Sequence, residues 1–232
     1  MQKRGKLCAI EGTDASGKNT QTIKLCDRLN ATNILCARDT FPRYNSPTGK
    51  IVGGPVLGKS EICPSFFLNG AGNIPASVAS LYYAADRLFN LPVLESLLRT
   101  NDILVLDRYV ESNMGHQGGK IRNPEERLNF FKKLENLEYG WCGLPRPDFT
   151  IFLYMPFQKG IELKSQMGVQ KDEVEKDEVY LRNSEESFLQ LAKLYNWKQI
   201  NCVENNNLRT KEDIHEEVYN FVKQQLEQKA LI

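Results

Sequence analysis

The chain has 232 residues, of which 41% are hydrophobic and 25% charged, and its formal net charge at pH 7 is +1. This composition is typical of a globular protein that buries a large core, and the near-neutral charge gives no indication of a nucleic-acid partner or an anionic membrane surface. The apolar run that follows the first six residues is too short for a signal peptide or a membrane span, so we expect a cytoplasmic protein.

Short apolar runs rich in branched residues predict five strands. They are Leu7–Ile10, Ile34–Ala37, Ile103–Leu106, Phe149–Leu153 and Lys198–Val203. Four of them lack the alternation of period two, as is typical of strands covered on both faces. Helical patterns separate them: Lys18–Asn30, Ser46–Leu57, Ala76–Arg99, Pro124–Glu138, Lys176–Tyr195 and Lys211–Glu227. We therefore predict an α/β fold with a five-stranded parallel sheet, helices on both faces, and ligands beyond the strand C-termini.

Three local signals refine this prediction. Asn123 before Pro124 predicts a capped helix start, and Pro92 is expected to kink or divide its long helix. The segments Gly53–Ile74 and Lys159–Lys176 are rich in loop-forming or charged residues and are predicted to be mobile loops. Nothing in the chain separates domains, so residues 1–232 are expected to form one domain.

Six cysteines are scattered along the chain without a C-x-x-C pair. A disulfide framework or a zinc site is therefore not expected. Cys8, Cys36 and Cys202 lie in apolar strand-like runs, where a free cysteine behaves as a small buried hydrophobe.

The most informative motif lies directly after the first predicted strand. Gly12, Gly17 and Lys18 have the spacing G-x-x-x-x-G-K, between an apolar run and a helical pattern. This arrangement is typical of a loop whose backbone N–H groups and lysine bind the phosphates of a nucleoside triphosphate. The alternative is a surface lysine after a tight turn. Because a lysine there faces the positive end of the helix dipole, a purely structural role is the weaker interpretation.

The metal-binding position of this motif is unusual. Asn19 occupies the place where a Ser or Thr hydroxyl normally ligates Mg²⁺, and Thr20 comes one residue later. An amide oxygen is also a Mg²⁺ ligand, directly or through water, so the sequence leaves open which of the two residues serves.

A second candidate group follows the third predicted strand. Asp107 and Arg108 come at the end of an apolar run, where ligands bind in this architecture. A structural salt bridge is one interpretation of the pair. Beside a phosphate loop, Asp107 becomes a candidate for the metal site and Arg108 for a bidentate phosphate contact.

Weaker signals lie on three other segments. Tyr83 and Arg87 share a helix face, which suits a core aromatic with a surface arginine or a stacking platform with a base-edge donor. Phe41-Pro42-Arg43 follows the second predicted strand. The polar segment from Ser112 to Gly118 contains His116, for which no orienting partner is evident, so a catalytic histidine is not expected there.

Together these residues resemble the thymidylate kinase family over essentially the whole chain. The shared blocks are Glu11-Gly12-Thr13-Asp14 with Gly17-Lys18, Phe41-Pro42-Arg43, Ala85-Asp86-Arg87, Asp107-Arg108-Tyr109, Gln117-Gly118 and Gly143-Leu144-Pro145-Arg146-Pro147-Asp148. Each block is modest alone, but six in the family's order are specific. The resemblance implies a P-loop nucleoside monophosphate kinase fold, with ATP and dTMP as substrates, Mg²⁺ as cofactor and a homodimer built through helices.

The resemblance also implies residue roles. The catalytic residues would be Lys18, Asp14, Arg108 and Asp107, with Asn19 and Asp107 near the metal. ATP would be bound by Gly12, Thr13, Asp14, Ala15, Ser16, Gly17, Lys18, Asn19 and Thr20. The dTMP site would be formed by Asp14, Phe41, Pro42, Arg43, Tyr83, Arg87, Arg108, Ser112, Gln117 and Tyr180.

The chain departs from the family near the donor phosphates. Some members have an arginine where this chain has Ala15, and others supply arginines from a lid over the donor. The matching lid, about residues 159–176, offers Lys164 and Lys171 but no arginine before Arg182. A lysine lacks the bidentate fork of arginine, so a slower turnover or a different transition-state contact is expected.

The leading hypothesis is ATP-dependent, Mg²⁺-dependent phosphorylation of dTMP to dTDP. Two alternatives remain: a kinase for another nucleotide, and a catalytically impaired nucleotide-binding regulator of the same fold. The altered donor side motivates the regulator, whereas the acceptor residues around Tyr83 and Arg87 argue against it. A GTPase is disfavoured because the chain has no Asn-Lys-x-Asp segment.

Overall fold

The computed structural model describes residues 4–67, 70–166 and 178–228. Its central feature is a parallel sheet in the order β2-β3-β1-β4-β5. The strands are β1 (Lys6–Gly12), β2 (Cys36–Thr40), β3 (Ile103–Asp107), β4 (Phe149–Tyr154) and β5 (Lys198–Asn201). The five predicted strands are thus confirmed, with the second displaced toward its C-terminus. In parallel strands the carboxyl ends share one edge, and β1 and β3 lie side by side there with Ile10 opposite Asp107.

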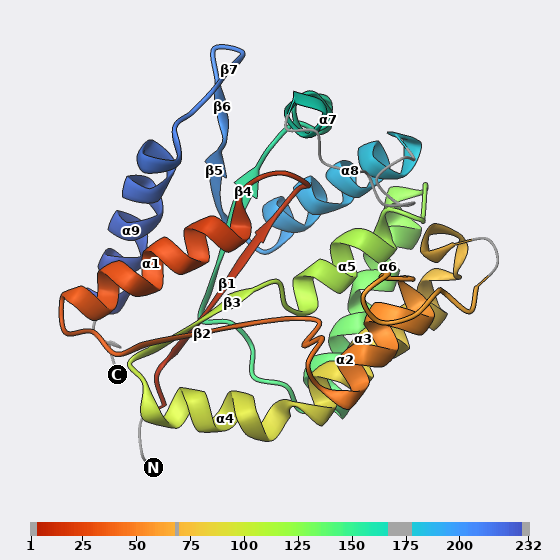
Figure 1. The fold of residues 1–232 in the computed structure, drawn as a ribbon, viewed down its shortest axis with the longest axis horizontal. Coiled ribbons are helices and arrows are strands. Elements are labelled where there is room, and N and C mark those ends of the chain that lie inside the picture. The colour runs from red at the N-terminus through yellow and green to blue at the C-terminus, as the bar shows by residue number, and fades with distance from the viewer. Residues whose placement is uncertain (1–3, 68–69, 167–177, 229–232) are drawn as a thin grey trace.

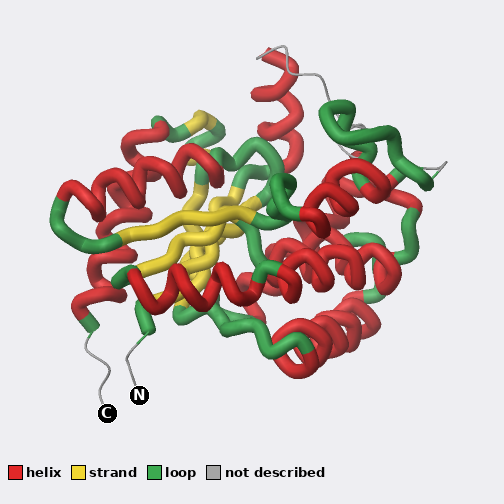
Figure 2. Tube along the Cα trace, turned by 60° about the horizontal axis from the view of Figure 1, so that its bottom comes forward, coloured by secondary structure: helices red, strands yellow, loops and turns green. Residues whose placement is uncertain are grey.

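Helices cover both faces of the sheet (Figures 1 and 2). On one face lie α1 (Lys18–Ala31) and α9 (Lys211–Glu227), packed against alternate residues of the strands. On the other lie α3 (Ala76–Phe89), α4 (Leu91–Thr100), α5 (Val110–Gly118), α6 (Pro124–Glu135) and α8 (Glu178–Leu194). Strand β1 shows why alternation is absent: Cys8 and Ile10 enter one core, Leu7 and Ala9 the other. Both faces are apolar because both are buried.

The helix boundaries follow the local signals. Asn123 caps α6, where its side chain accepts hydrogen bonds from Glu125 N at 2.8 Å and Glu126 N at 3.3 Å. Pro92 lies in the first turn of α4, so the long predicted helix is divided into α3 and α4. The predicted helix from Ser46 becomes α2 (Pro47–Ile51) followed by a π-helix, Val52–Val56.

Several sequence-based expectations were wrong. Residues 112–118, which are absent from the predicted helices, belong to α5, and the first part of the expected loop from Lys159 is α7 (Phe157–Gln166). The rest of that loop, to residue 176, lies outside the described residues. In the expected loop Gly53–Ile74, the π-helix and a 3₁₀ turn, Ala71–Asn73, are formed.

The C-terminal half contains a hairpin that the sequence pattern did not predict. It pairs β6 (Val203–Glu204) with β7 (Asn207–Leu208). The turn residues Asn205 and Asn206 both have positive φ, 48° and 64°, which asparagine tolerates better than most residues and which a type I′ hairpin turn requires.

Two cysteines form a disulfide, and one of them, Cys36, was expected to be a free buried thiol. Cys26 on α1 and Cys36 at the start of β2 form a disulfide, ten residues apart in sequence. After α1 the chain reverses direction and enters β2 beside the C-terminal half of that helix. This reversal brings the side chains of Cys26 and Cys36 together. Among the described residues Cys8, Cys63, Cys142 and Cys202 are free, which confirms the expectation for Cys8 and Cys202.

The acidic residue Glu111, in the first turn of α5, is buried although it forms no ion pair among the described residues. Its Oε1 accepts a hydrogen bond from Tyr139 Oη at 2.5 Å. Burial, together with the nearby negative charge of Glu11, raises the pKa of Glu111 to about 7. The folded protein therefore holds a proton that the unfolded chain releases at lower pH.

We predict that Glu111→Gln flattens the pH dependence of stability. Because the folded-state pKa is raised, wild-type stability falls as pH increases through about 5 to 7, by on the order of 3 kcal/mol from this group. The variant removes that contribution, so its free energy of unfolding exceeds that of the wild type at pH 8 and approaches it at pH 5. Urea unfolding at both pH values measures the difference.

Glu95→Gln on the exposed side of α4 is the matched control, with no change expected at either pH. An equal effect of Glu111→Gln at pH 5 and pH 8 would contradict the assignment of the titration to Glu111.

Candidate functional site

The loop between β1 and α1 has the close packing that its glycines predict. A Cβ on Gly12 would lie 2.4 Å from Ser16 Oγ and 2.6 Å from Leu153 O, so no larger residue fits. Gly17 has φ 80° and Ala15 φ 57°, a left-handed conformation that is costly for alanine. The loop therefore turns tightly enough to direct successive backbone N–H groups toward one point.

Lys18 begins α1 and is almost fully buried. Its Nζ donates to Gly12 O at 3.0 Å and to Thr13 O at 2.9 Å. Thr13 is itself fixed to the end of β4, because its Oγ1 donates to Met155 O at 2.6 Å and accepts from Met155 N at 2.8 Å. Burial and the positive charge of Arg108 lower the pKa of Lys18 to about 8. A buried cation at a helix N-terminus favours an anion at this place.

The turn after β3 faces the loop from the neighbouring strand. Arg108 has φ 68°, and its backbone N–H donates to Ile10 O at 3.2 Å. Asp107 Oδ1 is buried and has no hydrogen-bond partner among the described residues. An acceptor oxygen without a donor suits a cation or a cation-bound water, so Asp107 fits a Mg²⁺ site. Asn19, in the first turn of α1, is exposed.

Helix α7 lies against the loop. Lys164 forms an ion pair with Asp14, and a Cβ on Gly160 would lie only 3.1 Å from Asp14 O. Burial opposes ionisation of Asp14, but the Lys164 ammonium outweighs it and lowers the pKa of this carboxyl. Asp14 is therefore ionised at neutral pH. Thr13, Asp14, Lys164 and His116 line a small pocket at this place.

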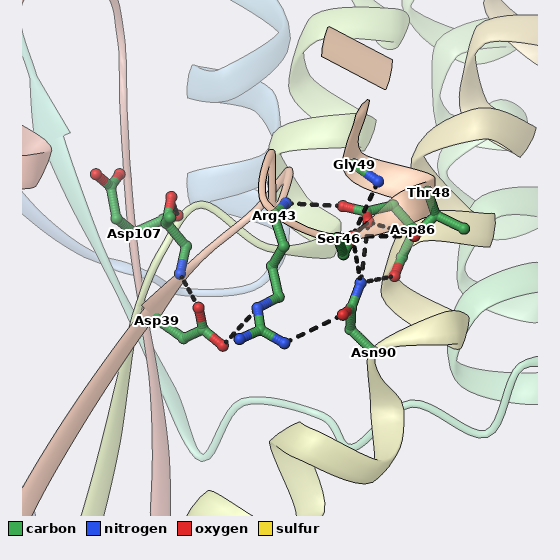
Figure 3. Close-up of polar contacts among 9 residues, drawn as sticks. Asp39, Arg43, Ser46, Thr48, Gly49, Asp86, Asn90 and Asp107 are labelled. Atoms are coloured by element: carbon green, nitrogen blue, oxygen red, sulfur yellow. Dashed lines mark hydrogen bonds and ion pairs between the residues drawn. The ribbon is translucent and has the colours of Figure 1, made fainter. Parts of the chain in front are cut away.

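Arg43 lies in a polar network at the end of β2 (Figure 3). Its guanidinium lies between Asp39 and Asn90, with Nε 3.2 Å from Asp39 Oδ2 and Nη1 3.1 Å from Asn90 Oδ1. Asp86 on α3 accepts from Arg43 N at 2.9 Å and from Thr48 Oγ1 at 2.8 Å. The buried Asp86 thus fixes the loop that carries Arg43 to α3.

Arg87 is neither a surface arginine nor unpaired. It is 2% exposed and forms a two-point ion pair with Glu138, which is fully buried. Asn113 on α5 also donates to Glu138, from Nδ2 to Oε1 at 2.8 Å. Glu138 lies 51 residues beyond Arg87 in the chain, so periodicity around Arg87 gave no signal for this pair. Of the two interpretations of Arg87, exposure on the surface is wrong.

Helix α5 presents two amide side chains one turn apart. Asn113 Oδ1 and Gln117 Oε1 are both buried without a hydrogen-bond partner among the described residues. Ser112 lies on the same helix, and its Oγ donates to Glu11 Oε2 at 2.5 Å. Sequence reasoning selected Gln117 and Ser112 but missed Asn113. Once the segment is known to be helical, the spacing of four residues from Gln117 places Asn113 on the same face.

His116 was not expected to be catalytic, because the sequence shows no orienting partner for it. Its Nε2 lies 2.9 Å from Arg108 Nη1, and its Nδ1 lies 3.3 Å from both Tyr180 Oη and Ser184 Oγ on α8. It therefore has the partners that the sequence did not indicate. Helices α5 and α8 approach closely because Gly115 has no side chain. A Cβ at this position would overlap the Phe188 ring.

The structure brings most of the predicted residues to the carboxyl edge of the sheet. The loop residues, Asp107, Arg108, Lys164 and Tyr180 converge there. Phe41 is instead a core residue, 2% exposed, with its ring 6.0 Å from that of Tyr109 and a cis peptide bond to Pro42. Lys171 lies outside the described residues.

Tyr83 occupies a different environment. It is partly buried and packs against a small cluster formed by Val56, Ile74 and Ala79. Tyr83 is thus part of the wall made by α3 and the segment after α2, and its role as a stacking platform stays a prediction.

Comparisons with known proteins identify the relatives of this arrangement. Residues 10–218 match the family model described as thymidylate kinase. A thymidylate kinase of Prochlorococcus marinus is 30% identical over 87% of this chain and 90% of its own length. The human thymidylate kinase is 25% identical, with 93% and 89% covered. Among solved structures, thymidylate kinase from Candida albicans superposes with a TM-score of 0.69 over 96% of this chain and 92% of its own, at 22% identity.

We predict that Glu138→Gln destabilises the protein strongly. The substitution leaves the buried guanidinium of Arg87 without its counter-charge, which costs about 3 kcal/mol or more of unfolding free energy. Chemical denaturation monitored by circular dichroism measures it.

Glu135→Gln provides the matched control. It breaks a surface ion pair with Arg146, whose side chain is 58% exposed, and should change the unfolding free energy by about 0.5 kcal/mol or less. Equal effects of the two substitutions would contradict a structural role for the Arg87–Glu138 pair.

Proposed function

We propose a role for each residue of the candidate site from the premise that this chain belongs to the thymidylate kinase family. The enzyme transfers a phosphoryl group from ATP to dTMP and releases dTDP and ADP. Neither the family match nor its relatives favour the nucleotide-binding regulator considered from the sequence. The observation that carries the assignment to this site is the phosphate loop of residues 12–18, with its buried Lys18, at the carboxyl edge of the sheet.

The donor half is assigned to the loop and the start of α1. Backbone N–H groups from Gly12 to Thr20 bind the ATP phosphates, and the Lys18 ammonium moves from its two loop carbonyls to a phosphate oxygen. This exchange is favourable because an anion beside Lys18 stabilises its charged form, which burial and the charge of Arg108 disfavour.

The residues fit a Mg²⁺ ion on the same side. Asp107 and the exposed Asn19 would hold the ion directly or through water, Asp107 through its Oδ1, which has no partner in the part of the chain that the structure describes. When bound, Mg²⁺ neutralises negative charge on the donor phosphates.

The acceptor half is assigned to groups around α3, α5 and the turn after β3. Arg108 binds the dTMP phosphate, and Asp14 accepts from the deoxyribose 3′-hydroxyl. The base is assigned to Tyr83 for stacking, Gln117 for its edge and Arg87 for a carbonyl, with Glu138 holding the Arg87 guanidinium in place. Ser112, Pro42 and Tyr180 complete this half, with Phe41 packed behind it in the core. Arg43 supports it from the network with Asp39 and Asn90.

Transfer then needs alignment and charge neutralisation rather than a covalent intermediate. Lys18 and Arg108 act on the transferring group from the donor and acceptor sides. Lys164, which forms an ion pair with Asp14, is assigned as the lid cation because the sequence from residue 159 has no arginine before Arg182. Lys171 remains a predicted second lid cation, and the lid as a unit about residues 159–176 remains a prediction.

A homodimer is proposed through α3. Its residues Val78, Leu81, Ala85 and Phe89 recur on one face and are exposed; the side chains of Leu81 and Phe89 are each 56% accessible. An exposed apolar stripe of this length favours a partner surface. A cytoplasmic location also remains a prediction. Among the described residues, no helix is long and apolar enough to span a membrane.

We predict that the purified protein, with ATP and Mg²⁺, phosphorylates dTMP at least about tenfold faster than dCMP, dGMP or UMP at equal concentration, because only thymine matches the proposed base contacts. A coupled ADP-release assay with and without each acceptor measures this. Failure to prefer dTMP would favour a kinase for another nucleotide.

Lys18→Ala supplies the control for the site assignment. It removes a charge used mainly in the transition state, so turnover should fall by about 10²-fold or more. Near-normal turnover of this variant would show that the phosphates bind elsewhere.

We predict that Leu81→Glu converts the dimer to a monomer, because it places a charge in the centre of the exposed stripe on α3. Size-exclusion chromatography with light scattering measures the mass. Leu208→Glu makes the same substitution at an exposed leucine of the β6–β7 hairpin and should leave the mass unchanged. If the wild type itself has the mass of one chain, the proposed dimer is wrong.

A further inference from the structure

Arg108 combines a fixed backbone with a long side chain that must point in one direction. Its left-handed φ of 68° is held by its own N–H bond to Ile10 O and by the neighbouring bond from Tyr109 N to Glu11 Oε1 at 2.8 Å. These contacts fix the Cα but leave the rotatable bonds of the side chain undetermined. A phosphate-binding arginine is effective only if its planar fork is already oriented, since ordering it on binding costs entropy.

His116 supplies that orientation from two turns further along the chain. Its Nε2 lies 2.9 Å from Arg108 Nη1, within hydrogen-bond distance. The imidazole is itself fixed from α8: its ring is stacked on Tyr180 with an interplanar angle of 3° and meets Phe188 edge-on at a centroid distance of 5.2 Å. Two aromatic rings of α8 thus hold the imidazole, one parallel to it and one perpendicular.

The protonation state follows from the donors. A guanidinium has only N–H donors, so His116 Nε2 must accept and carries no hydrogen. The hydrogen of the neutral ring is then on Nδ1, where Tyr180 Oη and Ser184 Oγ are the available acceptors at 3.3 Å. Burial lowers the pKa of His116 to about 3, and the charges of Arg108, Lys18 and Lys120 act in the same direction against that of Asp14. The ring is neutral at physiological pH, as the accepting role requires.

We infer that His116 is a positioning residue for the acceptor phosphate: its neutral imidazole accepts a hydrogen bond from Arg108 and fixes the guanidinium toward the dTMP phosphate while anchoring it to α8. The inference rests on the proposed binding of that phosphate by Arg108. It assigns His116 no contact with the nucleoside and no proton transfer.

The test compares two ligands that differ only in the phosphate. Isothermal titration calorimetry gives the affinities of dTMP and of thymidine, the latter by displacement, for wild type, His116→Phe and Arg108→Ala. Phenylalanine keeps the ring that stacks on Tyr180 but has no acceptor for Arg108. We expect His116→Phe to weaken dTMP binding about tenfold, the scale of one charge-assisted hydrogen bond, and to leave thymidine binding unchanged.

Two amide variants keep the test decisive if the aromatic one does not fold. His116→Gln places an amide at the position of Nε2 and should restore the wild-type ratio of the two affinities. His116→Asn reaches only the position of Nδ1 and should behave as His116→Phe. The chain's other histidine, His215 on α9, is 7% exposed, and His215→Phe should leave the ratio unchanged.

The outcomes separate the inference from the function on which it rests. If Arg108→Ala leaves the ratio of dTMP to thymidine affinity unchanged, the proposed role of Arg108 fails. If Arg108→Ala collapses the ratio while His116→Phe and His116→Asn retain it, the positioning role of His116 is overturned. Equal weakening of both ligands by the His116 variants overturns it as well, because the residue then acts on the nucleoside or on the fold.

Discussion

The carboxylate of Glu11 connects the parts of the proposed site. This residue is the last but one of β1, one position before the phosphate loop, and is 0% exposed. Its oxygens accept hydrogen bonds from Tyr109 N, from Ser112 N at 3.1 Å and from Ser112 Oγ. A carboxylate on β1 thus caps α5, the helix that follows the neighbouring strand β3. Because α5 has no side-chain cap of its own, Glu11 fixes the loop, the Asp107–Arg108 turn and α5 relative to one another.

A second layer of buried charge lies behind this one. Glu138 binds Arg87 from α3 and Asn113 from α5, which joins the two helices that flank the proposed base pocket. Buried ion pairs often contribute little net stability, because desolvation offsets the attraction, but breaking one leaves an uncompensated charge. We therefore interpret this pair as a device that fixes the pocket wall.

The unusual features of the chain gather on the donor side. Ala15 adopts a left-handed backbone in the loop, Asn19 replaces the usual hydroxyl, and Lys164 pairs with Asp14 from α7. The loop nevertheless keeps the close packing at Gly12 and the buried Lys18. The scaffold for phosphates is thus retained while the surrounding cations differ, and any difference in rate from relatives is expected to arise there.

The sequence by itself determined the α/β alternation, the five strands, the phosphate loop and the candidates at strand ends, because these depend on local periodicity and on neighbours in the chain. The tertiary structure alone decided the partners of Arg87 and His116, the Cys26–Cys36 bond and the capping of α5 by Glu11. Each of these joins residues that packing brings together across elements. Helix α5 is polar and rich in glycine, so local propensity does not predict it. Its glycines allow α8 to pack closely against it, and this contact exists only in the tertiary structure.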